Sequence, residues 1–165
     1  RIYGNDQASL WALVDAEDYR HFCAWRWCPT KPCAIARRKV YLRRQIGNRT
    51  LYLHVEIMKR IEPPPSPLHI IADHKNGNGL DNRRQNLRPA TQSQNHANQA
   101  KTRGTSQYKG VYRRGDCRRW GANIRQAGRT IHLGLFENEA DAARAYNAAA
   151  DQLFGEYAKL NEIQS

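Results

Sequence analysis

The sequence predicts an α+β protein made of two small units that follow one another along the chain. Strand-like alternation of apolar and polar residues recurs in residues 1 to about 60 and again in residues 108–136. The alanine-rich run ENEADAARAYNAAADQLFG has the three- and four-residue spacing of a helix. KTRGTSQ, at residues 101–107, is polar and contains glycine, as linkers do. We therefore place the first unit at residues 1–100 and the second at residues 108–162.

The first unit is predicted to begin with antiparallel strands. The runs AIARRKVYLRR and RTLYLHVEIM suit strands joined by the turn QIGN, with a helix possible from Leu53 onward. The run EPPPSPLH ends any such helix, because proline lacks the backbone donor that a helix needs. Phe22, Trp25 and Trp27 are interpreted as core residues, since a small sheet needs large side chains to close its core.

The segment after the prolines is predicted to form a hairpin followed by a helix. LHIIAD is a short strand, KNGNGLDNRRQ a long turn, NLRP a returning strand and TQSQNHANQ a helix. Thr91 followed by Gln94 is a capping-box pattern. This order is expected to bring Asp73 and His74, at the end of the first strand, to face Asn95 across a small cleft.

The second unit is predicted to hold three strands and one helix. YKGVYRR, RRWGANIRQ and RTIHLGLF are the strands, and Ala127 and Gly128 form a tight turn between the last two. Asn138 is predicted to cap the helix, with Asp141 at the third helical position, and Gly155 to end it. The helix residues expected to pack on the sheet are Ala143, Tyr146, Ala149 or Ala150, and Leu153.

Charge makes a polyanion the expected partner. The chain holds 27 Lys and Arg against 15 Asp and Glu, a formal net charge of +12. Nucleic acid is favoured over a membrane, because the sequence has no long apolar run and no basic amphipathic helix. Residues 101–134 contain nine Lys or Arg and one Asp, whereas residues 135–165 contain two Lys or Arg and six Asp or Glu. We therefore expect the second sheet, rather than its helix, to meet DNA.

Strand alternation divides the second sheet into two faces. The residues predicted to face the helix are Val111, Trp120, Ala122, Ile124, Ile131 and Leu133. The residues predicted to face outward and bind DNA are Tyr112, Arg114, Arg119, Asn123, Arg125, Thr130 and His132. Arg114 and Arg125 are expected to make the main base or phosphate contacts. Any one of these arginines is as readily a solvated surface charge as a DNA contact. For the outward face as a group, the interpretation as solvated charges is weaker.

The four cysteines do not have the spacing of a zinc site. They lie at positions 23, 28, 33 and 117, without paired Cys-x2-Cys spacing, and are interpreted as ordinary thiols in a reducing compartment. The chain begins at Arg1 with neither an apolar leader nor a start methionine, which leaves room for further residues upstream. An intracellular, cytoplasmic protein is expected.

Several motifs carry a resemblance to known families. VDAEDY near the start, LHVEIM, ADHKNGN, NL and TQSQNHANQ together resemble the HNH homing endonucleases of the phage type, over nearly the whole first unit. YKGVYRR, WGANIR, HLGLFENEADAARAYNAAA and GEYAKLN, in residues 108–161, resemble the AP2 DNA-binding domain. The resemblance implies an N-terminal HNH (ββα-metal) nuclease domain, followed by an AP2 domain with a three-stranded antiparallel sheet packed on one helix.

For the first unit, the resemblance implies hydrolysis of a phosphodiester. Asp73 and Asn95 would hold one divalent cation, Mg²⁺ or Mn²⁺, through oxygen atoms. His74 would be the general base toward water, Asn86 would orient His74, and the products would be a 5′-phosphate and a 3′-hydroxyl. Taken singly, Asp73 could merely begin the turn and Asn95 could be a solvated helix residue, but the order of the motif favours an active site. The remaining histidines considered, interpreted as packing or surface residues, are His54, His69 and His96.

The AP2 resemblance has departures that affect the expected target. Tyr112 occupies a usual arginine position, His132 a usual tryptophan position, and the loop around Asp116 is longer, so a GC-rich target is not assumed.

One active site per chain favours a monomer that nicks double-stranded DNA. The alternative is a non-catalytic DNA-binding regulator that keeps the HNH fold as a platform. The presence of all four predicted site residues, Asp73, His74, Asn86 and Asn95, disfavours this alternative. An RNA-binding module is disfavoured, because the strands lack exposed ring motifs for stacking bases.

Overall fold

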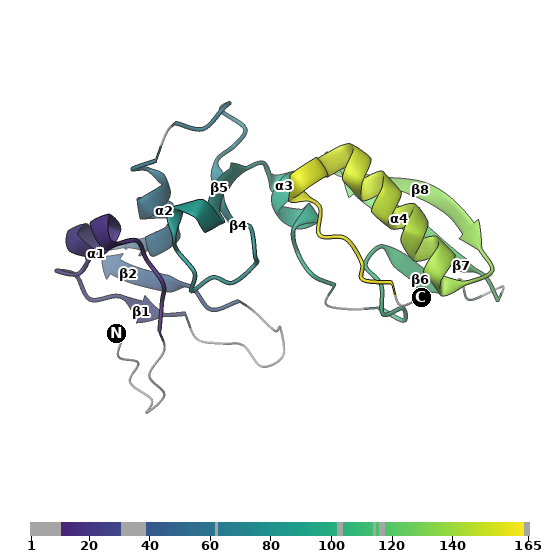
Figure 1. Cartoon of the computed structure of the whole chain (residues 1–165), viewed down its shortest axis with the longest axis horizontal. Helices are drawn as coiled ribbons and strands as arrows, with labels where there is room; N and C mark the ends of the chain where they lie inside the picture. Colours follow the sequence, from purple (N-terminus) through teal and green to yellow (C-terminus); the bar gives the residue numbers. More distant parts are fainter. Residues whose placement is uncertain are drawn as a thin grey trace. The chain divides into compact units, whose positions relative to one another are not determined.

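The computed structural model describes residues 11–30, 39–61, 63–101, 104–113, 115 and 118–163. Contacts within the chain group it into two units, Arg1–Thr91 and Gln92–Ser165. The described part of the first unit has a three-stranded and a two-stranded antiparallel sheet, and that of the second a three-stranded one (Figure 1). Each unit also has its own core of buried apolar residues. The segment after Thr91, which the sequence pattern placed in the first unit, is grouped by these contacts with the second.

The first unit starts with a helix that the sequence pattern did not predict. The helix, α1, spans Ala16–Phe22 and has acidic residues in its first turn and basic residues in its last. This charge order suits the helix dipole, which is positive at the N-terminus and negative at the C-terminus. The strand-like alternation predicted for residues 1 to about 60 was therefore wrong at α1, where the chain is helical. Seven residues span only two turns, too few to establish a helical period.

A three-stranded sheet follows, in the order β1-β2-β3. Its strands are β1 Cys28–Pro29, β2 Leu42–Ile46 and β3 Arg49–Tyr52. The predicted turn between β2 and β3 is confirmed, and Gly47 in it has φ +53°, which glycine adopts without a steric penalty. The helix predicted from Leu53 is also confirmed as α2, Leu53–Met58. Residues 34–38, where the first strand run was predicted to begin, lie outside the described residues.

The core of the first unit joins both helices to the sheet. Its buried apolar residues are Phe22, Trp27, Leu42, Leu53, Ile57 and Leu87. The prediction that Phe22 and Trp27 are core residues is confirmed, but the same prediction for Trp25 was wrong. Trp25 is 38% exposed, and the guanidinium carbon of Arg44 lies 4.9 Å from the centroid of its ring. A surface tryptophan can cover one ring face with an arginine in this way and keep the other in water.

The predicted hairpin is confirmed. Its strands are β4, Ile71–His74, and β5, Leu87–Ala90, which pair so that Asp73 lies opposite Arg88 and His74 opposite Leu87. The connecting loop also contains a 3₁₀ turn, η1 (Arg84–Asn86), that the pattern did not predict. Asp73 and His74 therefore lie where β4 ends and the loop begins.

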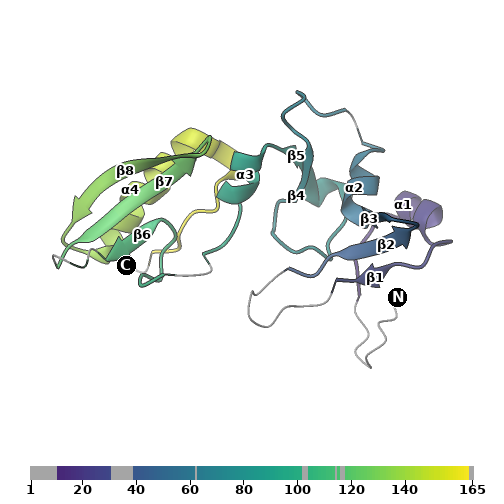
Figure 2. The same cartoon turned by 180° about the vertical axis from the view of Figure 1, so that it is seen from behind.

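The second unit is a three-stranded sheet with one long helix on one face (Figures 1 and 2). Its elements are β6 Val111–Arg113, β7 Trp120–Gln126, β8 Arg129–Phe136, α4 Glu139–Phe154 and the 3₁₀ turn η2 Gly155–Tyr157. The predicted tight turn is confirmed, with φ 47° at Ala127 and 82° at Gly128, the conformation of a type I′ hairpin. A bulge between Ala122 and Asn123 shifts the register so that Asn123 pairs with His132.

The ends of α4 agree with the predicted limits. Asn138 precedes the helix and Gly155, with φ 51°, follows it. The Asn138 side chain does not cap a backbone N–H, but donates from Nδ2 to Asp141 Oδ2 at 3.1 Å. The face that packs on the sheet buries Ala142, Ala143, Tyr146, Ala150 and Phe154. Gly110 lets this helix approach closely, because a Cβ there would lie 2.0 Å from the Tyr146 ring.

The short helix α3, Gln92–Ala97, packs within the second unit. Ala97 is buried in a cluster with Ile124, Tyr146, Ala150 and Phe154. The Lys109 ammonium donates to the carbonyls of His96, at 3.1 Å, and Ala97, and the backbone N–H of Lys159 donates to Ala97 at 3.0 Å. The carbonyls at the end of α3 are thus satisfied by groups of the second unit, which fixes this helix to it.

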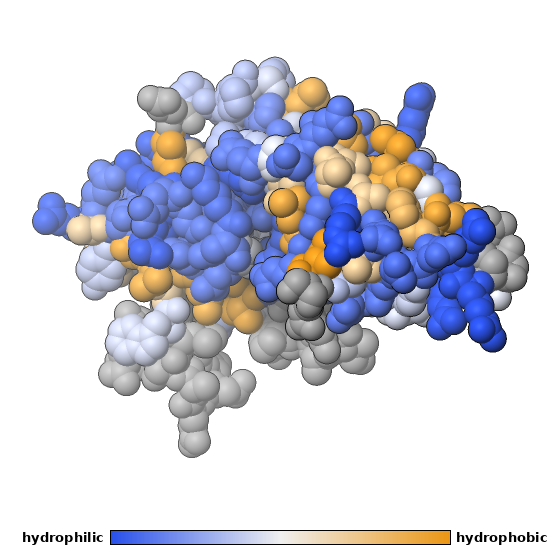
Figure 3. Space-filling view, turned by 45° about the vertical axis from the view of Figure 1, so that its right-hand side comes forward, coloured by the Kyte–Doolittle hydropathy of each residue, from blue (hydrophilic) through white to orange (hydrophobic). Residues whose placement is uncertain are grey.

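The surface is mainly polar. Hydrophilic residues cover most of the face shown in Figure 3, with hydrophobic residues gathered in smaller patches. Among the described large hydrophobic side chains, Leu68 and Ile70 are the most exposed, at 73% and 81%. The described part of the chain contains no helix long and apolar enough to span a membrane.

Candidate active site

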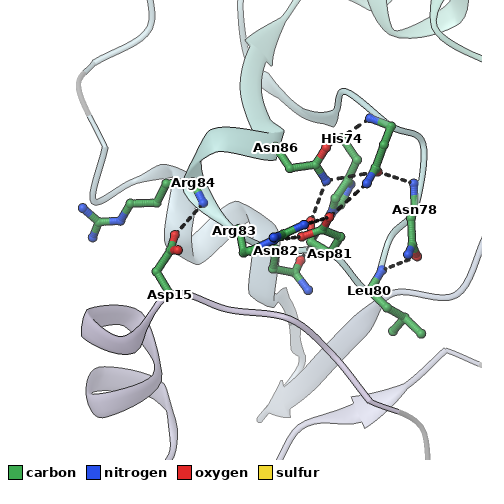
Figure 4. Close-up of polar contacts among 10 residues, drawn as sticks. Asp15, His74, Asn78, Leu80, Asp81, Asn82, Arg83, Arg84 and Asn86 are labelled. Carbon is green, nitrogen blue, oxygen red and sulfur yellow. Dashed lines mark hydrogen bonds and ion pairs between the residues drawn. The ribbon is translucent and has the colours of Figure 1, made fainter.

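The loop between β4 and β5 is held in shape by its own asparagines (Figure 4). Asn76 Nδ2 donates to Asp81 Oδ2 at 2.9 Å, and Asn76 Oδ1 accepts from Asn86 Nδ2 at 3.1 Å and from the backbone N–H of Asn78 at 2.8 Å. Asn86 also accepts the backbone N–H of Asn76 at 3.1 Å and donates to the Asp81 carbonyl at 2.7 Å. A carboxamide both donates and accepts, so asparagines can link the parts of this loop to one another.

His74 is buried at the end of β4 and contacts Asn82. Only 3% of His74 is exposed, and its Nε2 lies 3.2 Å from Oδ1 of Asn82, which is fully buried. A carboxamide oxygen can only accept, so His74 Nε2 is the donor and Nδ1 holds the lone pair. Asn82 therefore sets both the orientation and the tautomer of the imidazole, as the orienting partner of a catalytic histidine does.

The structure gives Asn82 the contact that the resemblance implied for Asn86. The hydrogen bonds of Asn86 go to the loop, through Asn76 and Asp81, whereas Asn82 bonds the His74 ring. Spacing could not single out Asn82, because it is one of several asparagines in the same polar run. Its hydrogen bond to the His74 ring distinguishes it, and that contact depends on the folded path of the loop.

Burial keeps His74 in its neutral form. It lowers the pKa of His74 below its usual 6.5, and the charge of Lys39 acts in the same direction. The hydrogen bond to Asn82 and the charges of Asp73 and Asp81 oppose this change only in part. The imidazole is therefore uncharged near neutral pH, the state in which it can accept a proton from water.

A second histidine and a tyrosine pack against His74. The His54 ring centroid is 4.9 Å from that of His74, and Tyr41 lies 5.1 Å from His54 and 5.8 Å from His74. Burial, with a smaller contribution from His74, lowers the pKa of His54 to about 3, so this ring is neutral as well. The interpretation of His54 as a packing residue holds, but sequence reasoning missed that it packs on His74.

Asp73 is a buried carboxylate paired with an arginine. It is 3% exposed, and its Oδ2 accepts from Arg88 Nε at 3.1 Å across the hairpin. A buried charge needs such a partner. A carboxylate offers oxygen atoms with about four lone-pair positions, so the chemistry of Asp73 fits a hard cation. Asn95, the second predicted ligand, lies on α3 in the second unit and offers a carboxamide oxygen.

Two aspartates of the VDAEDY motif bind the loop between β4 and β5. Asp15 Oδ2 accepts the backbone N–H of Arg84 at 2.8 Å (Figure 4). Asp18 is fully buried and accepts two bonds from the Arg84 guanidinium, at 2.8 and 2.9 Å, and one from Arg60 at 3.3 Å. Arg84 lies between Asn82 and Asn86, so these aspartates fix the position of the loop between the two asparagines.

Six of the seven predicted DNA-binding residues are described, and Arg114 lies outside the described residues. Arg119, Arg125, Thr130 and His132 are exposed, and Tyr112 and Asn123 are half-buried. Tyr112 Oη lies 3.4 Å from His132 Nδ1.

The opposite face of this sheet packs on α4, with one exception. Val111, Ala122 and Ile124 are buried, and Trp120 and Leu133 are partly buried against the same clusters. Ile131 pairs with the buried Ile124 and so lies on the same face, as predicted, but it is 39% exposed near the turn that precedes β8. The alternation therefore predicts the two faces, but not how far each residue is buried.

Comparison with known proteins supports the HNH part of the resemblance. An uncharacterized HNH endonuclease of Acanthamoeba polyphaga mimivirus is 34% identical over 113 residues, which cover 68% of this chain and 58% of that protein. The chain thus spans less than two thirds of the length of this relative. No family model matches the chain. No solved structure matches it.

Proposed function

We propose that the protein is a metal-dependent DNA endonuclease of the HNH type that nicks duplex DNA. The observation that carries this proposal is the buried, neutral His74, oriented by Asn82 at the end of a hairpin strand beside Asp73. The similarity to a protein named as an HNH endonuclease supports it. The homing-type resemblance supports a site preference, and one site per chain supports nicking by a monomer.

The mechanism follows from the residues around His74. Hydrolysis needs a deprotonated water and stabilisation of the charge that builds on the phosphate and on the leaving 3′ oxygen. His74 accepts the proton of the attacking water at Nδ1, because Asn82 keeps the ring proton on Nε2. Asp73 and Asn95 would hold Mg²⁺ or Mn²⁺ through oxygen atoms. When bound, such an ion stabilises negative charge on the phosphate and the leaving oxygen.

The outward face of the second sheet is proposed to bind the duplex. Its exposed Arg119 and Arg125 supply positive charge, and Asn123, Thr130 and His132 supply hydrogen-bonding groups. A β-sheet face can enter the major groove, as the AP2 resemblance implies. We also propose that the protein acts in the cytoplasm of a bacterial or phage-infected cell, with which the free thiols of Cys23 and Cys28 agree.

Cleavage is expected to depend on a divalent metal and on Asn95. The purified protein should convert supercoiled plasmid into relaxed circles with Mg²⁺ or Mn²⁺, and a chelator should stop the reaction. Asn95→Ala should raise the metal concentration needed for half-maximal cleavage by at least about 10-fold, because one oxygen ligand is lost. Gln99→Ala, an exposed carboxamide just beyond α3, is the matched control. Tight binding without cutting, across several targets and metals, would instead favour a non-catalytic DNA-binding regulator.

Asn82→Ala is expected to slow cleavage by about 100-fold or more, because His74 loses the partner that fixes its tautomer. Single-turnover cleavage measures the effect, and DNA binding should not change. Asn78→Ala is the control, since the Asn78 side chain bonds Leu80 in the same loop and not His74. Asn82→Asp, which keeps the acceptor oxygen, should retain more activity than Asn82→Ala. Equal rates for Asn82→Ala and the parent would show that this contact has no part in the reaction.

A further inference from the structure

A short segment before α1 pairs with the loop that holds Asn82. We call this segment, residues 11–15, the N-terminal strap. Within it, Leu13 pairs with the loop as a parallel β-bridge. The Leu13 N–H donates to the Leu80 carbonyl at 2.9 Å, and the Leu13 carbonyl accepts the Asn82 N–H at 2.8 Å. The strap therefore fixes the loop backbone at the residue whose side chain contacts His74.

Asp15, the last residue of the N-terminal strap, makes a second contact with the same loop. Its Oδ2 accepts the backbone N–H of Arg84 at 2.8 Å (Figure 4). Asp15 also occupies the position just before α1, where an aspartate ordinarily accepts a backbone N–H of the first helical turn. Its side chain makes no such bond. Loss of a favourable local bond in exchange for a contact 69 residues away is typical of a residue with a functional role.

The orientation of Asn82 depends on its backbone. Its side chain is fully buried, and its Oδ1 lies 3.2 Å from His74 Nε2. Its Nδ2 has no hydrogen-bond partner in the described part of the chain. A carboxamide has both a donor and an acceptor, and here only the acceptor is directed by a partner. The position of the backbone at Asn82, which the N-terminal strap fixes, therefore decides where Oδ1 lies.

We propose that the N-terminal strap positions His74 for proton transfer, with Asp15 as a positioning residue that acts through Asn82. Without the Asp15 carboxylate, the loop backbone at Arg84 loses a charged hydrogen-bond acceptor, and Asn82 is held less firmly. A displacement of about 1 Å at a catalytic group can reduce a rate by about 100-fold. This inference rests on the proposed function, but it assigns a role to a residue outside the predicted active site.

Asp18 holds the same loop in a different way. It bonds the Arg84 guanidinium, which a long side chain separates from the loop backbone. Asp15 instead bonds the Arg84 backbone directly, two residues from Asn82. We therefore expect the loss of Asp18 to reduce mainly the stability of the first unit, and the loss of Asp15 to reduce mainly the cleavage rate.

Asp15→Ala should slow single-turnover cleavage at saturating DNA by about 10-fold and leave the affinity for the duplex unchanged. Asp15→Asn keeps an acceptor oxygen for the Arg84 N–H, so its rate should stay within about threefold of the parent rate. Glu17→Ala is the matched control, because Glu17 is an exposed carboxylate that pairs with the Arg84 side chain and not with its backbone. This control should cut at the parent rate. Equal rates for Asp15→Ala and the parent would overturn the proposal.

A double variant separates positioning from a general loss of structure. If Asp15 acts through Asn82, adding Asp15→Ala to Asn82→Ala should change the cleavage rate by less than about twofold, because the path to His74 is already broken. A further loss of about 10-fold in the double variant would show that Asp15 acts by another route, and the proposal would be wrong.

The ring proton of His74 gives a test that needs no cleavage. Nitrogen NMR spectra of protein with isotope-labelled histidine distinguish a proton on Nε2 from one on Nδ1, and the His74 signals are those absent from His74→Ala. In the parent and in Glu17→Ala the proton should lie on Nε2, whereas Asp15→Ala should show a mixture of both forms. An unchanged spectrum of Asp15→Ala would contradict the proposal. The spectra are recorded near neutral pH with a chelator and without DNA, so they test the positioning of His74 even if the protein cuts no plasmid and the nuclease proposal fails.

Discussion

Replacing His74 with alanine is expected to reduce cleavage by about 10²- to 10⁴-fold, the range that general base catalysis contributes. In the proposed mechanism the neutral imidazole of His74 accepts the proton of water. The other histidine beside it, His54, has its Nδ1 buried without a hydrogen-bond partner in the described structure. DNA binding should persist, because the exposed cations of the chain are unchanged. Single-turnover cleavage of a labelled duplex measures the loss, and a gel shift measures the binding.

The control for this variant is His21→Ala. His21 is an exposed histidine in the last turn of α1, so its removal should leave the cleavage rate at the parent level. Thermal unfolding of both variants separates a loss of chemistry from a loss of fold. If His74→Ala cuts within about threefold of the parent rate, His74 is not the base, and His54→Ala becomes the next variant to measure because the two rings adjoin.

Replacing Asp18 with alanine is expected to destabilise the first unit by about 3–5 kcal/mol. Asp18 is fully buried, and its loss leaves the Arg84 guanidinium without two hydrogen bonds and Arg60 without one. Denaturant unfolding followed by the tryptophan fluorescence of the first unit measures the change. Glu17→Ala is the matched control: its side chain is 59% exposed and also pairs with Arg84, so its removal should cost about 1 kcal/mol or less. Equal losses for the two variants would contradict this account.

The Asp18 carboxylate also predicts that the first unit loses stability in acid. The hydrogen bond and charge of Arg84, with those of Arg60, hold the pKa of Asp18 below its usual 3.8 despite burial. A carboxyl whose pKa is lower in the folded state than in the unfolded state stabilises the folded state. This stabilisation is complete at pH values above the unfolded pKa and is lost as the pH falls through the folded pKa. The denaturant midpoint of the first unit should therefore fall as the pH is lowered below about 3.8. The midpoint of Asp18→Ala should fall less over the same pH range.

Much of the fold could be predicted because its signals are local. The turns at Gly47 and at Ala127 with Gly128, the β4-β5 hairpin and the limits of α4 each depend on a few adjacent residues. Helix α1 could not be predicted, since it is too short to show a period. Trp25 could not be placed either, because the sequence does not show that Arg44, from β2, lies over its ring.

The sequence by itself determined the kinds of elements, the separation of basic strands from an acidic helix, and the order of polar residues that resembles an HNH site. Only the tertiary structure decided that Asn82 orients His74, that His54 packs beside it, and that Asp18 holds Arg84 from 66 residues away. The reason is that several asparagines and arginines are chemically alike in the sequence. Which of them meets a given partner depends on the path of the folded chain, and that path is set by contacts between distant residues.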